Sequence, residues 1–440
     1  AGDNLNRSAK ENYGLKRYGR EEIGTAKPGA YRWETVPSGE DKYARWNISV
    51  LGASATDDYR NEINGQGWVT EIDPYNPTST VKKLTTMGRM AHEGAAFSLP
   101  VAGKPLAVYM GDDSSGEYIY KFVSDATWSD ADATASNRMA VGDKYLDQGT
   151  LYAAKFNADG TGEWVELSMN NPAVRYYTHS SGFSFADDGE VLIYARIAAD
   201  AAGATKMDRP EWSATNPGNG EIYLTLTNNS SRTVDGTDAA NPRSYTDNDG
   251  LKKKGNVHGH IVRIKDANGE PSATSFSWDV YLFGSEADSD GATVNLSGLT
   301  DDQDFSSPDG IVFSKSTGIC WIQTDDGNYT DVTNCMMLAG LPGKVGDGGP
   351  VTVDHGTKQV TTQMGAKPTE ATLKRFLVGP VGQEITGMAE TPDGRVMFVN
   401  VQHPEGNWPA NAGYGPGGAT GRPRSATVMI TKNDGGRVGS

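Results

Sequence analysis

Acidic residues beside glycine occur early in the chain, in a pattern that suits the binding of hard metal cations. Glu93 is followed by Gly94, which lets the backbone turn so that the carbonyl oxygen of Ala95 can reach an ion held by the Glu93 carboxylate. Asp112 stands in a second acidic turn, Gly-Asp-Asp. We predict Glu93, Ala95 and Asp112 as metal ligands. The same spacing also suits carboxylates that cap turns, beside a structural histidine at His92.

Arg209 and Glu211 flank a proline, and this spacing can bring a cation and a carboxylate to one centre. Proline biases the residue before it toward an extended backbone, in which residues two apart project to the same side. Arginine suits phosphate because its fork of donors binds two oxygens at once. We predict that Arg209 binds phosphate and that Glu211 binds metal. The alternative that remains open is an ion pair between the two on a surface loop.

Two further acidic residues stand at the entrance to predicted strands. Asp309 lies in Ser-Ser-Pro-Asp-Gly, and Glu384 lies in Gln-Glu-Ile-Thr-Gly. From these positions the loops of a propeller reach its central channel, so we predict both as metal ligands. Asp393 shares the Pro-Asp-Gly pattern of Asp309, and that pattern also suits a simple hairpin turn.

Several catalytic patterns are absent from the sequence. It has no Walker A motif, no GxGxxG after a strand, no GxSxG and no HExxH, which argues against nucleotide-driven chemistry, Rossmann dehydrogenation, α/β-hydrolase action and zincin proteolysis. Cys320 and Cys335 carry no CxxC or histidine partner, which argues against a zinc site between them. A local disulfide between them would fit an oxidising compartment, and two free thiols are equally open.

The composition is that of a globular protein with an acidic excess. The formal net charge of -16 argues against nucleic acid as a partner, because a phosphate backbone is bound by clustered lysine and arginine. Such an excess is typical of a solvated surface and also of a calcium-binding protein. No apolar run is long enough to span a membrane. The start at Ala1 has neither an initiator methionine nor a signal peptide, so we expect a processed, trimmed or missing N-terminus.

Short apolar and β-branched stretches recur between turns and predict an all-β fold without crossover helices. An Asp-Gly pair precedes an apolar stretch at positions 188, 309 and 393, which suits type I′ hairpins repeated around a β-propeller. A large β-sandwich or a β-helix is the rival architecture. We expect residues 1–60 to form an arm or insertion and residues 61–440 a single propeller domain with long loops. The representative strands predicted are 67–72, 117–122, 191–195, 221–226, 259–264 and 396–401.

Eight strings, in the same order and spread over nearly the whole chain beyond residue 60, resemble PhoX-type alkaline phosphatases. They are GWVTEIDPYNP (67–77), RMAHEGA (89–95), GDDSSGEYIYKF (111–122), ATKMDRPEW (204–212), LTNN (226–229), GHIVR (259–263), SPDG (307–310) and TPDGRVMFVNVQHP (391–404).

The resemblance implies a fold, a location and an activity. It implies a β-propeller, secretion to the periplasm or outside the cell, and hydrolysis of small phosphomonoesters to phosphate by a monomer carrying Ca2+ and Fe3+ ions. Such ions neutralise phosphoryl oxygens and activate an oxygen nucleophile, so that no serine is required. Arg209 resembles the arginine that holds the phosphate. The residues that resemble metal ligands are Glu93, Ala95 through its carbonyl, Asp112, Glu211, Asp309 and Glu384.

The sequence departs from the family at its beginning. Family members have a further N-terminal portion, with a cysteine that bridges the irons and with additional acidic ligands, and no counterpart stands before residue 60. Neither Cys320 nor Cys335 lies in a matching context. We therefore expect a propeller that is incomplete at its N-terminal side, with an incomplete metal centre. Either that portion is cleaved or left out of this sequence, or this copy has lost the iron site, with or without loss of its activity.

Three hypotheses for function follow from these patterns. The leading one is a metal-dependent phosphomonoesterase, motivated by the ordered motifs around Glu93, Arg209 and Asp309. The second is a propeller module that binds calcium for stability or recognition without turnover. The third is another calcium-dependent propeller hydrolase, such as a lactonase. It shares the acidic turns but does not explain the Arg-Pro-Glu string.

Overall fold

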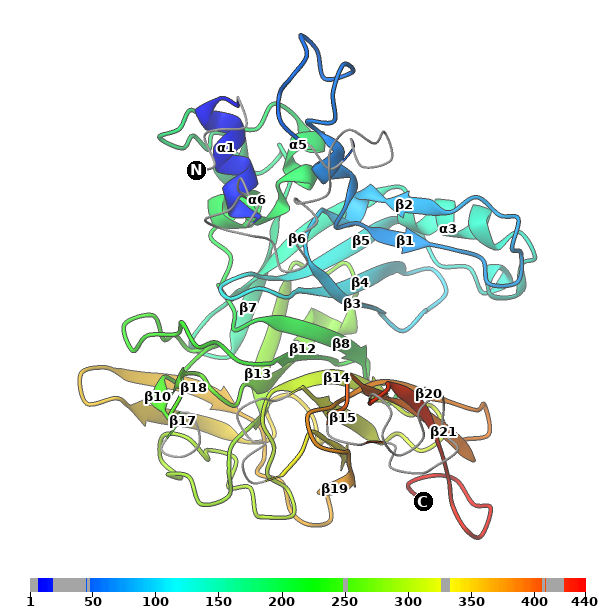
Figure 1. Ribbon diagram of the computed structural model, residues 1–440, viewed down its shortest axis with the longest axis vertical. Coiled ribbons are helices and arrows are strands. Elements are labelled where there is room, and N and C mark those ends of the chain that lie inside the picture. The colour runs from blue at the N-terminus through cyan, green and yellow to red at the C-terminus, as the bar shows by residue number, and fades with distance from the viewer. Residues whose placement is uncertain are drawn as a thin grey trace.

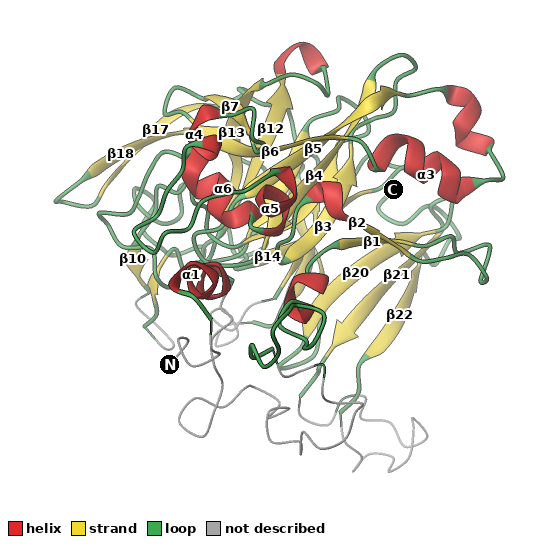
Figure 2. Cartoon of the chain, turned by 90° about the horizontal axis from the view of Figure 1, so that it is seen from above, coloured by secondary structure: helices red, strands yellow, loops and turns green. Residues whose placement is uncertain are grey.

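The computed structural model describes residues 7–18, 45, 48–247, 252–325, 333–405, 408 and 423–440. Most of the arm predicted over residues 1–60 lies outside the described residues, and its first described element is helix α1 (Ala9–Arg17). Most of the other regular structure is β-strand (Figures 1 and 2).

Antiparallel strands form four blades within the described residues, in the order of the sequence. The first blade contains β3 (His92–Phe97), β4 (Pro105–Asp112), β5 (Ile119–Thr127), β6 (Gly149–Phe156) and β7 (Thr161–Glu166). The second contains β8 (Pro210–Thr215), β9 (Ile222–Leu226), β12 (His260–Asp266) and β13 (Ser275–Phe283). The third contains β14 (Pro308–Phe313), β15 (Cys320–Thr324), β16 (Met336–Gly340) and β19 (Leu373–Val378). The fourth contains β20 (Glu384–Glu390), β21 (Val396–Gln402) and β22 (Ala426–Thr431).

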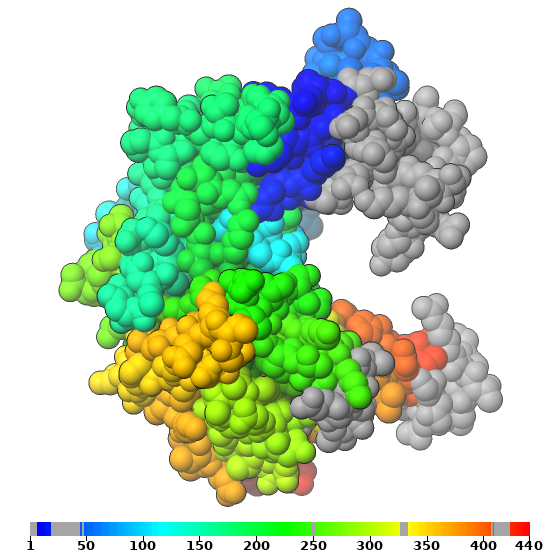
Figure 3. Space-filling model, turned by 90° about the vertical axis from the view of Figure 1, so that its left-hand side faces the viewer, coloured from blue at the N-terminus to red at the C-terminus, as the bar shows by residue number. Residues whose placement is uncertain are grey.

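The first strands of successive blades lie side by side. β8 packs against β3 and β14, and β14 packs against β20, so these four strands follow one another through the molecule (Figure 1). Pairing of β7 with β13 joins the first two blades into one sheet. A hairpin extends the same sheet, and its strands are β17 (Gly349–Asp354) and β18 (Gln359–Met364). In the space-filling view the N-terminal and C-terminal halves lie one above the other, with a hollow between them on one side (Figure 3).

Apolar residues of the strands fill the spaces between neighbouring blades. In β9, Ile222 and Leu224 pack toward the first blade, whereas Tyr223 packs toward the third. In β15, Ile322 faces the second blade and Trp321 faces the fourth. Both β9 and β15 therefore bury their two faces, because side chains alternate in direction along a strand. This radial packing confirms the predicted all-β propeller and excludes the sandwich and the β-helix.

Short helices and ribbons lie outside the blades. The helices are α3 (Arg138–Leu146), α4 (Pro172–Arg175), α5 (Asp188–Ile193) and α6 (Ala195–Ala202), with short 3-10 turns at Glu62–Gly65, Thr85–Met87, Asp130–Thr134 and Ala267–Gly269. The ribbons pair β1 (Val69–Glu71) with β2 (Lys82–Leu84), and β10 (Tyr245–Thr246) with β11 (Lys254–Gly255). None of the described helices is long and apolar enough to cross a membrane.

One predicted strand is wrong, because residues 191–195 belong to helices α5 and α6. Asp187 caps α5: its side chain accepts a hydrogen bond of 2.9 Å from the backbone N of Glu190. The Asp-Gly pair at position 188 is thus the first turn of a helix and not a hairpin. The other predicted stretches coincide with β1, β5, β9, β12 and β21.

The remaining Asp-Gly pairs also differ from the predicted type I′ hairpins. Asp309 and Gly310 lie inside β14, whereas Asp393 and Gly394 do turn between β20 and β21. Gly394 has a positive φ of 70° and Asp393 does not, so this hairpin is not of type I′, which needs positive φ at both central residues.

Cys320 and Cys335 are both buried, and no disulfide joins them in the described structure. The disulfide that the sequence left open is therefore not formed in the structure.

Candidate metal centre

Three carboxylates converge where the first strands of three blades begin. Glu93 is the second residue of β3, Glu211 the second of β8 and Asp309 the second of β14. One carboxylate oxygen from each residue lies within 4.8 Å of the other two. Glu93 and Glu211 are more than a hundred positions apart in the sequence, yet the structure brings them to one point among the blades together with Asp309.

Irregular backbone at the start of each strand directs these side chains. Pro210 and Pro308 open β8 and β14, and the residues before them, Arg209 and Ser307, have positive φ of 55° and 50°. A register shift includes or adjoins each acidic residue, between positions 93 and 96 in β3, 210 and 213 in β8, and 308 and 311 in β14. Bulges of this kind turn a side chain away from the regular alternation, and they and strained φ values are common at functional sites.

The extended backbone predicted for Arg209 is therefore wrong, although its side chain does meet that of Glu211. Nη2 of Arg209 donates to Oε1 of Glu211 over 3.2 Å. The positive φ of Arg209, not the pre-proline preference, produces this contact.

Two glycines allow the first two blades to approach closely here. A Cβ atom at Gly111 would lie 2.3 Å from the backbone oxygen of Glu211. Gly94 has a φ of 83°, and a Cβ there would lie 3.2 Å from the backbone N of Ser213. Any side chain at position 111 would push β8 away and displace the Glu211 carboxylate.

Asp113 holds Arg209 in place and was not predicted as a site residue. Nη2 of Arg209 donates to Oδ2 of Asp113 over 2.9 Å, and Nε lies 2.9 Å from Oδ1. The Arg209 side chain is 32% exposed, so the guanidinium is anchored on one side and open on the other. Nη1 reaches Oδ1 of Asn228 at 3.5 Å.

Asp112, which was predicted as a ligand, points away from this group. Its carboxylate accepts hydrogen bonds from Nε and Nη2 of Arg196 over 2.7 and 2.5 Å, and from the backbone N of Ala91 over 3.0 Å. In the pairing of β3 with β4, His92 stands opposite Asp112 and Glu93 opposite Gly111. Because alternate residues face opposite sides of a strand, Asp112 and Glu93 lie on opposite sides. The same alternation would have indicated Asp113.

Glu384, the first residue of β20, lies near the three carboxylates in a neighbouring group. Its side-chain oxygen lies within 4.8 Å of ligand atoms of Asp325 and His403, and it accepts a hydrogen bond from Gln402. Ala95 lies two residues after Glu93 and is exposed. The role of its carbonyl oxygen as a calcium ligand stays a prediction.

The comparisons with known proteins identify the family of this chain. A family model described as alkaline phosphatase PhoX matches residues 5–405. The chain belongs to the PhoX alkaline phosphatase family. A solved structure titled Pseudomonas fluorescens PhoX in complex with vanadate, a transition state analogue, is 33% identical, with a TM-score of 0.69. The match covers 97% of this chain and 64% of that chain.

Two other results add no argument about this PhoX chain. A structure of a Trichoderma reesei enzyme of carbohydrate-active family AA12 is 11% identical over 76% of this chain and 84% of that chain, but its TM-score is only 0.22. A search of curated proteins finds no match.

The carboxylates of this PhoX chain carry negative charge in excess of their cationic partner. Burial, followed by the charge of Asp309 and that of Asp113, raises the pKa of Glu211. Burial, followed by the charge of Glu384, raises the pKa of Asp309. Burial and then the charge of Asp113 raise the pKa of Glu93. Arg209 is the guanidinium that offsets part of this repulsion. Crowded, desolvated carboxylates of this kind are stabilised by a bound cation.

The donor set fits hard cations. All three converging side chains offer carboxylate oxygens, which suit calcium and other hard ions such as ferric iron. The thiols of Cys320 and Cys335 lie elsewhere, in and beside the strands of the third blade. This PhoX chain therefore has the residues for metal binding by oxygen alone at the start of its inner strands.

Proposed function

We propose that this chain is a metal-dependent phosphomonoester hydrolase, an alkaline phosphatase of the PhoX type. The observation that carries the proposal is the convergence of Glu93, Glu211 and Asp309 beside the half-open guanidinium of Arg209. Membership of the PhoX family supports it, as does the similarity to a protein whose structure is a complex with vanadate. Because the chain spans 64% of that relative, the activity of the longer protein is proposed and not assumed.

The cations that we propose are Ca2+ and Fe3+. Glu93, Glu211 and Asp309 would hold them, and Glu384 is close enough to add a further carboxylate from the fourth blade. When bound, such ions neutralise phosphoryl oxygens and activate an oxygen nucleophile. Ala95 stays a proposed ligand through its carbonyl. The Asp112 carboxylate is engaged by Arg196 and is not part of the proposal.

Arg209 would bind and orient the phosphate group. Asp113 and Glu211 both accept from Nη2 of Arg209, and Oδ1 of Asp113 forms an ion pair with Nε, which fixes the plane of the fork and lowers the entropy lost when an anion binds. The exposed side is left to the substrate. Asp113 would act as a positioning residue, because it touches the arginine and not the phosphate.

A purely structural calcium module is not favoured as the alternative. A site built only to hold calcium gains nothing from an arginine that competes with the ion for Glu211. The position of Arg209 at the edge of the carboxylate group instead suits an anionic ligand that contacts both the cations and the guanidinium.

The setting of the enzyme is proposed from the family resemblance. We propose a periplasmic or secreted monomer that takes a small phosphomonoester and releases phosphate. The net charge of -16 supports a small ligand over nucleic acid, because the described cation at the site is a single arginine among several carboxylates.

Hydrolysis of p-nitrophenyl phosphate at alkaline pH tests the proposal. We expect turnover that is abolished by a chelator and restored by calcium with iron, while inorganic phosphate and vanadate inhibit. Elemental analysis of the same sample counts the bound ions. A chain that binds calcium and is folded, yet shows no chelator-sensitive hydrolysis, would exclude the enzyme and leave a binding module.

A further inference from the structure

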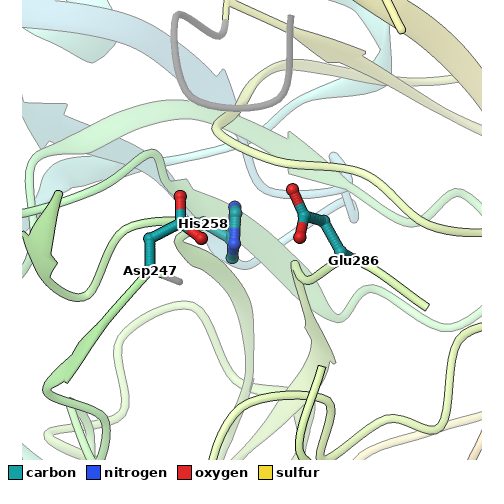
Figure 4. Close-up of side chains that lie close together, drawn as sticks. All are labelled: Asp247, His258 and Glu286. Carbon is teal, nitrogen blue, oxygen red and sulfur yellow. The ribbon is translucent and has the colours of Figure 1, made fainter. Parts of the chain in front are cut away.

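A second group of possible metal ligands lies apart from the inner strands. Asp247 follows β10, His258 precedes β12 and Glu286 follows β13, so three separate connections supply them. One ligand atom from each residue lies within 4.8 Å of the others. Figure 4 shows the His258 ring between the two carboxylates. All three are buried, with 6, 1 and 6% of their surfaces exposed.

His258 is the observation that points to a ligand. Both of its backbone groups form hydrogen bonds. Its N–H donates to the hydroxyl of Tyr245 over 3.0 Å, and its carbonyl accepts from the N–H of Ser307 over 3.0 Å. Its ring Nδ1, in contrast, is buried and has no hydrogen-bond partner among the described residues. A buried polar nitrogen without a partner has lost its hydrogen bonds to water and gained none in return, so its presence calls for an explanation.

A neighbouring histidine shows what a structural role looks like. His260 is equally buried, and both of its ring nitrogens are engaged, Nδ1 with the side chain of Asn256 at 3.0 Å and Nε2 with the carbonyl of Ala240 at 2.8 Å. His258 lies only two residues away and lacks such partners on Nδ1. The difference separates a histidine held for packing from one aimed at a pair of carboxylates.

The nearby arginine does not take the role of a cation for this group. Burial and then the charge of Arg243 lower the pKa of His258 to about 3. The guanidinium of Arg243 donates to the carbonyls of Gly284 and Val294 over 2.7 and 2.8 Å, and to Oδ1 of Asn256 over 2.9 Å. Its described donors are thus directed at neutral oxygens.

We propose that Asp247, His258 and Glu286 bind a divalent transition-metal ion such as zinc. One imidazole nitrogen and two carboxylate oxygens are three ligands of the kind that zinc takes, and imidazole is a ligand that calcium, with its preference for oxygen, does not favour. The site is therefore chemically distinct from the oxygen-only group at Glu93, Glu211 and Asp309. It does not depend on the proposed hydrolysis.

Binding would link this site to the strand that carries Asp309. The hydrogen bond from Ser307 to the His258 carbonyl holds the residue just before Pro308, and Ser307 has the positive φ that begins the strand. The neighbouring bridge of Ser285 with Phe305 joins the segment that carries Glu286 to the same approach to β14. A metal at His258 would accordingly stabilise the approach to β14 and the position of Asp309.

The full chain is stripped with a chelator, saturated with calcium and dialysed against zinc chloride, and bound zinc is counted by elemental analysis. We expect one zinc ion per chain in the wild-type protein and in Glu211→Gln, which alters only the oxygen-only group. His258→Gln should lose that ion. Glu286→Gln should weaken zinc binding at least about tenfold, since changes even outside the ligand shell cost 10–100-fold.

Melting of the same proteins separates binding from folding. Zinc should raise the melting temperature of the wild type and of Glu211→Gln but not of His258→Gln, while the metal-free proteins keep the same circular dichroism spectrum. Cobalt replacing zinc should give visible absorption bands that disappear in His258→Gln. If His258→Gln does not fold, the zinc content and the melting temperature of Glu286→Gln test the proposal instead. Wild-type protein that retains no zinc in excess calcium, or folded variants that retain as much as the wild type, would overturn the proposal.

Discussion

Buried carboxylates inside the blades differ in their charge partners from those at the centre, where the inner strands begin. In the blades, Asp112 is paired with Arg196, and Asp279 accepts from Nε and Nη2 of Arg263 over 2.6 and 2.9 Å. At the centre, the carboxylates share Arg209, which Asp113 already binds. The chain therefore neutralises the charge inside its blades with its own arginines. Among the described residues, the carboxylates at the centre outnumber their cationic partners, which is what a metal site requires.

The largest effect that tests this contrast is expected from Glu211→Gln. Removal of one central carboxylate should lower hydrolysis of p-nitrophenyl phosphate about a thousandfold, because a bound cation contributes several kcal/mol to the transition state. The metal-free variant should melt at the same or a higher temperature than the wild type, since repulsion with Asp309 is relieved. Glu163→Gln, at an exposed site of β7, is the matched control and should change neither property. Full activity in Glu211→Gln would contradict the central role of that carboxylate.

Arg209→Ala should reduce activity by about 10²–10³-fold, because it removes a charged donor aimed at the phosphate. Arg209→Lys keeps the charge but loses the fork, so it should recover only part of the activity and of the affinity for inorganic phosphate. Steady-state kinetics and phosphate inhibition measure both. Arg395→Lys, on an exposed turn, is the control. An Arg209→Lys variant with wild-type phosphate affinity would show that a point charge is enough.

Asp112→Asn tests the opposite side of the same strand pair. It leaves Arg196 buried beside a neutral side chain, which should lower the free energy of unfolding by about 3 kcal/mol. Denaturant unfolding of the metal-free chain measures this loss. Both variants replace a carboxylate by an amide. We expect Asp112→Asn to destabilise the chain, whereas Glu211→Gln should not. Equal stabilities of the two variants would show that the centre and the blades do not differ in this way.

The smallest effect concerns pH. The folded, metal-free chain has a raised pKa at Glu93, Glu211 and Asp309, so it binds more protons than the unfolded chain. Its stability from these groups is present below the ordinary glutamate value of 4.5 and is lost as the pH rises through the raised values. Calcium displaces those protons, so its stabilising effect should grow with pH, toward about 2.7 kcal/mol at a hundred times its dissociation constant.

Melting curves with and without calcium across the pH range measure this trend. Glu211→Gln should flatten the pH dependence, because one of the three groups with a raised pKa no longer titrates. A calcium shift that stays constant with pH in the wild type would contradict the assignment of the ion to these carboxylates.

The types of the central residues could be predicted from the sequence, whereas the orientation of their side chains could not. The strings around Glu93, Arg209 and Asp309 identified the residues, and the turn-bounded apolar stretches predicted a propeller. Asp112 was chosen over Asp113 because adjacent acidic residues look alike in sequence, and the register of β3 against β4 decides which one faces inward. The helix at 188–193 was missed because its apolar residues also suit a strand, although Asp187 and Glu190 form a capping pattern.

By itself, the sequence determined the fold class, the family and the set of acidic residues with one arginine, because residue types and short-range turn chemistry are local properties. Only the tertiary structure decided which carboxylates meet, which are paired with arginine and which way Arg209 turns. Those outcomes depend on bulges, positive φ values and strand register, which arise when blades distant in sequence pack against one another.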